Sequence, residues 1–233
     1  MTEMDKSQIL LSFFQKNCAL ITPVPTDEKE RFEYYKGAIN KLPPQYINES
    51  FLKIEDVYLA DTLQKEEIVS VEGLDAFITV SQNKAAFFSA DAVLSFLNEG
   101  SDKSIYLYGG TRLKTAVAHA ISGKDIAVTK ANNVKFSGVI SAQLPSIDLK
   151  LTSVILSKIT DKYTFALDVA MNNKLKTLVL TLPNIENAVL CSRVADAILG
   201  VIKQHAYTKQ LKIVLSAPNS KVFDVYKSKN GVL

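Results

Sequence analysis

The spacing of hydrophobic and polar positions changes near residue 68 of this 233-residue chain. Before that point apolar residues recur at helical intervals, and prolines at 23, 25, 43 and 44 separate three predicted helices. Beyond it, short apolar runs of strand length alternate with longer amphipathic stretches. The pattern predicts a helical N-terminal extension, residues 1–66, packed on an α/β core, residues 67–233.

Within the core, the pattern predicts strands at residues 75–80, 104–109, 125–130, 134–142, 176–183 and 212–217. It predicts helices at 90–97, 111–121, 149–170 and 188–205, followed by a terminal turn at 222–227. In the last third, each amphipathic helix leads into a continuous apolar strand of the kind that is buried on both faces. Short connections of this order favour parallel strands with right-handed crossovers. We therefore expect a three-layer α/β/α sandwich with a mixed, mostly parallel central sheet.

Composition places the chain among intracellular globular proteins, cytoplasmic or nuclear. Its longest apolar runs, such as 177–182, are far shorter than the ~20 residues of a membrane-spanning helix. The N-terminus carries early acids and no basic region, which favours a helix over a signal peptide. Cys18 and Cys191, the two cysteines, are expected to be buried and unpaired.

The formal net charge of +3 is unevenly spread along the sequence. Residues 1–149 hold 15 Lys and Arg against 19 Asp and Glu, whereas residues 150–233 hold 12 against 5, so the two parts carry −4 and +7. A basic C-terminal third suits an anionic partner, such as a phosphate-bearing ligand, nucleic acid or an acidic protein. It also suits a solvated face of amphipathic helices. No aromatic RNA-binding signature accompanies the charge, which disfavours nucleic acid.

Residues with catalytic or metal-binding potential are scattered singly. Cys18, Cys191, His119 and His205 do not have zinc-ligand spacing, so no metal site is predicted. Gly109-Gly110 lacks a dinucleotide or P-loop pattern around it, which favours an ordinary turn over a phosphate site. No motif pairs two carboxylates for acid–base work. We therefore predict no catalytic residue and no cofactor.

The C-terminal third resembles a macrodomain, the fold that binds ADP-ribose. The resemblance rests on the order of KTLVLTLP, the loop PNIEN, the helix AVLCSRVADAILGVIKQH and KIVLSAPNSKVFDVYK. DAFITVSQN, residues 75–83, looks like the DAIVNAANS strand and loop of that family. Residues 34–66 look like the helical extension that precedes zinc-containing microbial macrodomains, which are protein-ADP-ribosylhydrolases. The resemblance implies a cleft bordered by polar groups at matching loops: Ser81, Gln82, Asn83, Thr181, Asn184 and Asn187.

Departures from the family pattern fall at its functional motifs. Gln82 stands where the family has the asparagine that contacts the distal ribose. The GDIT segment with its adenine-binding aspartate, the glycine-rich loop and the zinc ligands have no counterpart in the alignment that the resemblance suggests. The second phosphate loop carries Pro183 and Glu186, which remove a backbone donor and add a repelling charge. The resemblance therefore implies little or no hydrolysis.

Three functions follow as hypotheses. The first is a non-catalytic macrodomain, a pseudoenzyme that serves as a protein-interaction or scaffold module, possible as one subunit of a complex. The second is a module with weak affinity for ADP-ribose or another nucleotide. The third is a protein ADP-ribosyl hydrolase that uses substituted residues. The shape of the cleft distinguishes these hypotheses: an open cleft would favour the two nucleotide hypotheses, and a closed cleft would favour the first.

Overall fold

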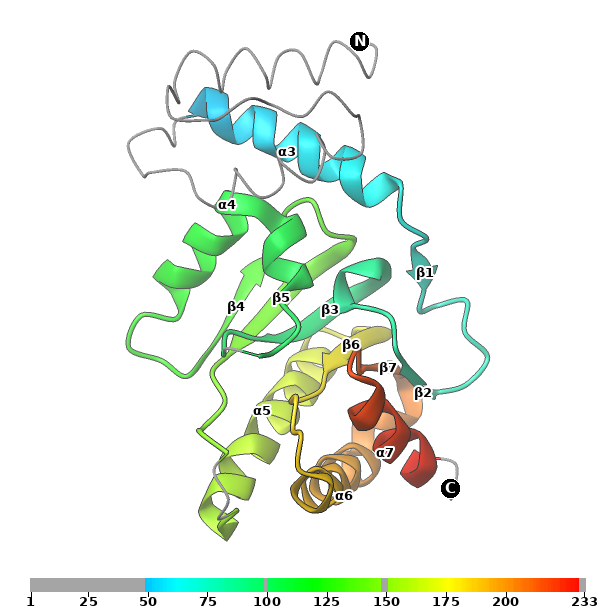
Figure 1. Cartoon of the computed structure of the whole chain (residues 1–233). Coiled ribbons are helices and arrows are strands. Elements are labelled where there is room, and N and C mark those ends of the chain that lie inside the picture. The colour runs from blue at the N-terminus through cyan, green and yellow to red at the C-terminus, as the bar shows by residue number, and fades with distance from the viewer. Residues whose placement is uncertain (1–48, 99, 148–150, 231–233) are drawn as a thin grey trace. The chain divides into compact units, whose positions relative to one another are not determined.

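Two units make up the chain, divided after Thr62, and each is described by itself. The computed structural model describes residues 49–98, 100–147 and 151–230 (Figure 1). The first two predicted helices lie outside these residues. The third is confirmed as α3, Glu49–Gln64, in which Glu49 of the first turn favours the positive end of the helix dipole.

The core is built on one sheet. Its strands are β1 (Val69–Ser70), β2 (Ile78–Ser81), β3 (Phe88–Phe96), β4 (Ile126–Lys130), β5 (Phe136–Ala142), β6 (Thr177–Thr181) and β7 (Lys212–Ser216). Their order is β2-β7-β6-β3-β5-β4, and β1 pairs with the first residues of β3. Every pairing is parallel except that of β4 with β5. The predicted mixed, mostly parallel sheet is confirmed.

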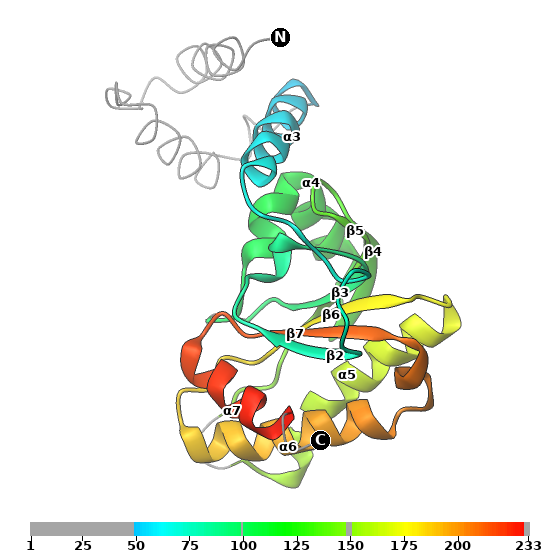
Figure 2. The same ribbon diagram turned by 90° about the vertical axis from the view of Figure 1, so that its right-hand side faces the viewer.

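Helices cover both faces of this sheet (Figure 2). One layer consists of α5 (Ser153–Asn172), α6 (Ala188–Gln204) and α7 (Ser220–Asn230), and the short helix η3 (Ala206–Gln210) joins α6 to β7. The other layer holds η2 (Ala85–Phe87) and α4 (Ser104–Ala120). Separate buried clusters fill the two interfaces, with Tyr163 and Ile198 in the first, and Ile105 and Leu113 in the second. The predicted three-layer sandwich is confirmed.

The predicted helix at residues 90–97 is wrong, because this segment is the central strand β3. β3 pairs with β6 on one side and with β5 on the other, which places it in the middle of the sheet. Helices cover both faces there, so Ala92, Leu94 and Phe96 enter one buried cluster and Val93 enters the other. Burial on both faces removes the alternation of polar and apolar residues that identifies a strand. A short continuous apolar run is then ambiguous between helix and strand.

The predicted strand at residues 104–109 is also wrong, because these residues form the beginning of α4. Ile105, Tyr106 and Tyr108 are all buried there, so apolar residues that looked alternating occupy one broad helical face. The helix that we predicted at 111–121 is the remainder of α4. The terminal turn predicted at 222–227 is part of the longer helix α7.

Gly109 and Gly110 lie at a kink within α4, where two helical segments meet. Gly110 has φ 69° and ψ −169°, a conformation that glycine alone adopts readily. A Cβ on Gly109 would stand 2.3 Å from Leu113 Cδ2. The amide of Asn132 donates to the Gly109 carbonyl at 3.1 Å, so this acceptor is satisfied at the break. The pair therefore permits a sharp bend and close packing inside α4.

Candidate functional site

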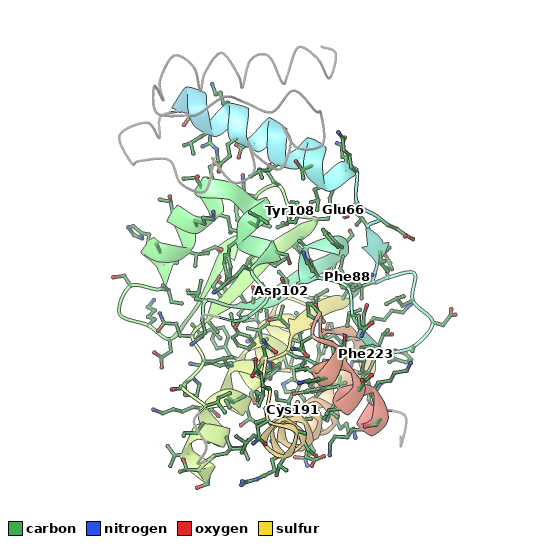
Figure 3. The ribbon with its side chains drawn as sticks, in the orientation of Figure 1. Glu66, Phe88, Asp102, Tyr108, Cys191 and Phe223 are labelled. Carbon is green, nitrogen blue, oxygen red and sulfur yellow. The ribbon has the colours of Figure 1, made fainter. Side chains whose placement is uncertain are left out.

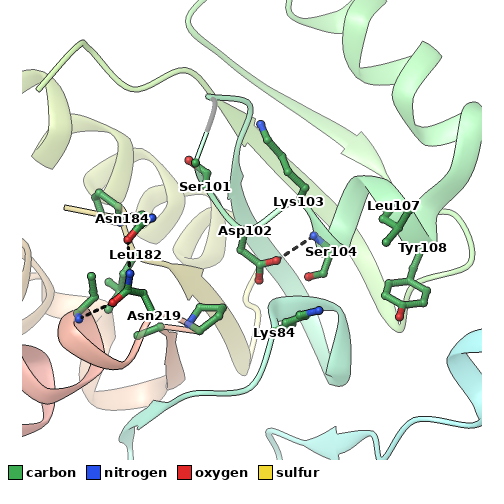
Figure 4. Close-up of a pocket in the computed structure, with 15 residues that line it drawn as sticks. Lys84, Ser101, Asp102, Lys103, Ser104, Leu107, Tyr108, Leu182, Asn184 and Asn219 are labelled. Carbon is green, nitrogen blue, oxygen red and sulfur yellow. Dashed lines mark hydrogen bonds between the residues drawn. The ribbon is translucent and has the colours of Figure 1, made fainter. Parts of the chain in front are cut away.

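A cleft opens at the carboxyl ends of three neighbouring parallel strands, β3, β6 and β7 (Figure 4). Its volume is about 420 Å³, within the range of small-molecule sites. Loops that follow these strands form most of its wall. The lining residues are Lys84, Gly100, Ser101, Asp102, Lys103, Ser104, Leu107, Tyr108, Leu182, Pro183, Asn184, Ala217, Pro218, Asn219 and Val222.

One wall is held together by Asp102. Its carboxylate accepts hydrogen bonds from the backbone N–H groups of Ala85 at 2.7 Å and Ser104 at 2.9 Å. The hydroxyl of Ser104 accepts a further bond from the N–H of Ala86 at 3.1 Å. These contacts satisfy N–H groups that the starts of η2 and α4 would otherwise leave unpaired. They fix the residues after Lys84 against the first turn of α4.

The opposite wall is built around two asparagines, which lie side by side in Figure 4. The amide of Asn219 donates to the Asn184 side-chain oxygen at 2.8 Å. The Asn219 oxygen accepts from the backbone N–H of Lys221 at 2.9 Å, as an N-cap of α7 does. The loop after β6 is thereby joined to the start of α7.

Charge in the cleft is mixed, with a small positive excess. Lys84 and Lys103 are exposed lining residues, and Asp102 is the one carboxylate among the described residues that line the cleft. The Lys103 ammonium group donates to the Leu97 carbonyl at 2.5 Å. The N-termini of α4 and α7 both meet the cleft, and their dipoles add partial positive charge. The arrangement suits a ligand with an anionic part.

Apolar side chains complete the lining. Leu107, Leu182 and Val222 contribute to it, together with the ring of Tyr108. That ring packs against the ring of Phe87, with centroids 5.7 Å apart. An apolar lining with a few polar groups is typical of sites that hold an organic ligand.

Of the six predicted site residues, the structure places Asn184 in the cleft lining. Thr181 is buried and its hydroxyl donates to the Leu94 carbonyl at 2.9 Å. Asn187 caps α6 by accepting from the N–H groups of Val189 and Leu190. Ser81 accepts a bond from the Asn83 N–H at 3.2 Å, and neither of these residues nor Gln82 lines the cleft.

Sequence reasoning missed most of the polar residues in the cleft. Asp102 and Ser104 lie at the junction of β3 and α4, for which the sequence pattern predicts the wrong elements, and Lys84 lies in the loop before η2, which carries no motif. Asn219 had a recognisable signal, since the run Pro218-Asn219-Ser220 follows a buried strand and asparagine is a favoured N-cap.

Groups outside the cleft have structural roles in the described part of the chain. Cys191 is buried among the helices α5, α6 and α7, and burial raises the pKa of its thiol (Figure 3). His205 follows α6, where its Nε2 lies 3.2 Å from Asp168.

Among the described residues, no group of three His, Cys, Asp or Glu side chains has the placement of a metal site. No described helix is long and apolar enough to cross a membrane.

Comparison with known proteins gives one relative by sequence. No protein-family model matches the chain. The chain is similar to a protein-ADP-ribose hydrolase of Treponema medium, with 23% identity over 180 residues. The match covers 66% of this chain and 69% of that protein.

Solved structures give a consistent set of matches. The macro domain of ganglioside-induced differentiation-associated protein 2 matches with a TM-score of 0.56 and 15% identity, covering 70% of this chain and 94% of that one. A mutant of the Oceanobacillus iheyensis macrodomain matches with a TM-score of 0.54 and 16% identity, covering 66% and 90%. Another mutant of that macrodomain, solved with ADPR, matches with a TM-score of 0.51 and 13% identity, covering 66% and 91%.

These matches and the strand order define the class: the chain has a macrodomain fold. At such low identity the likeness establishes the fold, while the function is argued from the cleft itself.

Proposed function

We propose that the cleft binds ADP-ribose or a closely related nucleoside-diphosphate ligand, and that the chain is a binding module. The observation that carries the proposal is an open cleft at the carboxyl ends of β3, β6 and β7, where two helix N-termini meet and Lys84 and Lys103 are lining residues. Ligands of parallel α/β sheets bind at such ends, and helix N-termini favour phosphate groups. The macrodomain of similar fold that was solved with ADPR adds support.

The sequence of the central strand supports the same proposal. In the central strand, Asp91–Ser95 reads DAVLS, which is closer to the start of the family pattern DAIVNAANS than the sequence at the edge strand β2. In this alignment, Asn98 stands at the position of the last asparagine of that pattern. We therefore align the family pattern with residues 91–98 instead of residues 75–83. In this alignment, the residues that follow the motif, Gly100–Lys103, line the cleft.

Binding without hydrolysis is favoured by the environment of Asn98. Its amide nitrogen donates to the Leu144 carbonyl at 2.9 Å, and its oxygen accepts from the Leu144 N–H at 2.6 Å. Each end of the amide therefore has one partner within the chain, and Asn98 is not among the residues that line the cleft, which disfavours the ribose contact that the family's asparagine makes. Hydrolysis remains a second candidate because the curated relative is a protein-ADP-ribose hydrolase. Release of ADP-ribose from a modified protein would support it.

A scaffold role, the first hypothesis from the sequence, is a further candidate. It is favoured by the internal pairing of cleft side chains, since Asp102 is bonded to two backbone N–H groups and Asn184 to Asn219. Such a role predicts recovery of a stable protein partner from native cells together with no response to nucleotides. A measured affinity for ADP-ribose would favour the binding module instead.

Isothermal titration calorimetry with ADP-ribose tests the leading proposal. Lys84→Ala should weaken binding by about three- to tenfold, because an ammonium group near a phosphate contributes on the order of 1 kcal/mol at a partly exposed site. Leu182→Trp should abolish binding by filling the cleft. Lys130→Ala, on the edge strand β4, is the matched control and should leave the affinity unchanged. Absence of heat and of a thermal shift at millimolar ADP-ribose would exclude the proposal.

A further inference from the structure

Four lysines gather at the end of the core opposite the cleft, and we call them the basic end face: Lys174, Lys176, Lys203 and Lys209. All four are exposed. Lys174 and Lys176 lie between α5 and β6, Lys203 is in the last turn of α6, and Lys209 belongs to η3, just before β7. They stand at the amino ends of β6 and β7, whereas the cleft stands at the carboxyl ends.

Hydrogen bonds between the supporting segments show that these lysines belong to one surface. The N–H of Lys212, at the start of β7, donates to the Lys176 carbonyl at 2.8 Å. The hydroxyl of Tyr207, in η3, donates to the Leu175 carbonyl at 2.8 Å. The hydroxyl of Thr208 donates to the Ile202 carbonyl at 2.5 Å, which joins η3 to the end of α6. Figure 2 shows these segments together at its right-hand side.

Nearby carboxylates offset only part of the charge of the basic end face, since Asp91 and Asp168 reduce the formal +4 of the lysines to +2. Asp91 accepts from the backbone N–H groups of Lys176 and Thr177 through one oxygen. Asp168 pairs with His205. In the described ranges, none of the four lysines has a carboxylate within salt-bridge distance. Glu72 and Asp75 border the surface on the side of β2, where Lys212 is bonded to the Glu72 and Leu74 carbonyls.

Helix dipoles explain only part of this charge. Lys203, in the last turn of α6, and Lys174, just after α5, are close to the negative ends of these helices. Lys209 is in the last turn of the short helix η3, whereas Lys176 lies four residues beyond the end of α5, outside its last turn. Four ammonium groups on one surface raise the local concentration of anions and steer an anionic partner toward it.

We propose that the basic end face is a docking surface for an acidic segment of a partner protein. Its charges are all lysines, although arginine is the residue better suited to bidentate phosphate contacts. Tyr207 is half-buried with its hydroxyl engaged, so it does not offer the stacking face that single-stranded nucleic acid uses. Met171 is 40% exposed, and its carbonyl accepts from the Lys174 N–H at 3.1 Å, which adds an apolar contact. A mixed apolar and basic surface fits an acidic peptide.

Fluorescence anisotropy with labelled decaglutamate tests this docking surface on the full chain. The test variant replaces all four lysines by glutamate, which lowers the formal net charge from +3 by four times two, to −5. The control variant makes the same change at four exposed lysines elsewhere: Lys124, Lys130, Lys135 and Lys158. Both variants have equal net charge, so a difference between them reports the position of the charges.

The native chain should bind decaglutamate, and the end-face variant should bind at least about tenfold more weakly than the control variant. Affinity should fall with salt and stay unchanged with saturating ADP-ribose. The proposal would be overturned if the native chain did not bind decaglutamate, or if both variants lost affinity equally. Competition by ADP-ribose, or tighter binding of oligo-dT of matching length, would also overturn it. If the glutamate variant does not give a native circular dichroism spectrum, the four-glutamine variant replaces it with the same expectations. The inference is independent of the function proposed for the cleft.

Discussion

The carboxylate of Asp102 accepts a hydrogen bond from the backbone N–H of Ala85 at 2.7 Å, across one wall of the cleft. Its other oxygen accepts from the N–H of Ser104 at 2.9 Å. Asp102 therefore holds the start of η2 against the start of α4. Hydrogen bonds to a charged acceptor are stronger than neutral ones, so this aspartate should contribute measurably to stability.

Asp102→Ala should lower the free energy of unfolding by about 1–3 kcal/mol, because it leaves two N–H groups without their acceptor. Urea denaturation followed by circular dichroism measures the change. Asp125→Ala is the control, since the Asp125 side chain is 78% exposed and lies 3.7 Å from Lys162. The control should change stability by no more than about 0.5 kcal/mol. Equal effects of the two substitutions would contradict a special role for Asp102.

Gly109→Ala should destabilise the chain by about 1–3 kcal/mol through overpacking. The added Cβ would stand 2.3 Å from Leu113 Cδ2 and 3.0 Å from Leu113 Cβ, so Leu113 must move. Gly200→Ala is the matched control within α6, where a Cβ meets no atom within 4 Å. It should stabilise by about 0.5–1 kcal/mol, because alanine is the better helix former. Thermal unfolding shifts of opposite sign are expected, and shifts of the same sign would refute this account of Gly109.

Within the last third of the fold, α5, β6, α6 and β7 could be predicted from the sequence because each has one clear environment. α6 presents Val194, Ile198 and Ile202 to the core at helical spacing, while Arg193, Asp196 and Lys203 lie outside its buried face. β6 is buried along its whole length, and Pro183 follows within two residues. The hydrophobic periodicity and the residues that end each element therefore indicate the same element types and the same boundaries.

The middle of the core and most of the cleft could not be predicted, for related reasons. The side chains of β3 enter buried clusters on both faces of the sheet, and the first turns of α4 bury nearly every side chain, so periodicity carries little information in either. Lys84 and Asp102 come together only through loops whose course depends on those two elements. Asn184 was found because its loop follows β6, which the sequence identifies clearly.

Two buried tyrosines differ in their hydrogen bonding and should respond differently to removal of the hydroxyl. Tyr163 donates to the Thr181 carbonyl at 2.8 Å, whereas the Tyr226 hydroxyl has no hydrogen-bond partner among the residues that the structure describes. Tyr163→Phe should lower stability by about 0.5–1.5 kcal/mol, the usual net value of one hydrogen bond. Tyr226→Phe should leave it unchanged or raise it by up to about 1 kcal/mol, because an unpaired buried hydroxyl is unfavourable. Urea midpoints rank the two variants, and a larger loss for Tyr226→Phe would contradict the assignment.

Alkaline pH should destabilise the fold partly through Tyr226. Burial raises the pKa of its hydroxyl well above the ordinary value of 10.0, and the negative charges of Cys191 and Asp196 act in the same direction. Above pH 10 the unfolded chain loses this proton while the folded chain keeps it, so the folded state binds more protons and stability falls as pH rises. Well below pH 10 the Tyr226 hydroxyl keeps its proton in both the folded and the unfolded chain, so this group gives no dependence of stability on pH there.

Replacement of Tyr226 by phenylalanine should therefore reduce the loss of stability between pH 10 and 11 by up to about 1.4 kcal/mol, the limit for one proton per pH unit. Lysine ionisation contributes equally to both proteins, so the difference between their urea denaturation curves isolates the tyrosine. Measurements at pH 8 and 9 supply the baseline, at which both proteins should show parallel behaviour. Identical slopes above pH 10 would show that the Tyr226 hydroxyl ionises in the folded chain as it does in the unfolded one.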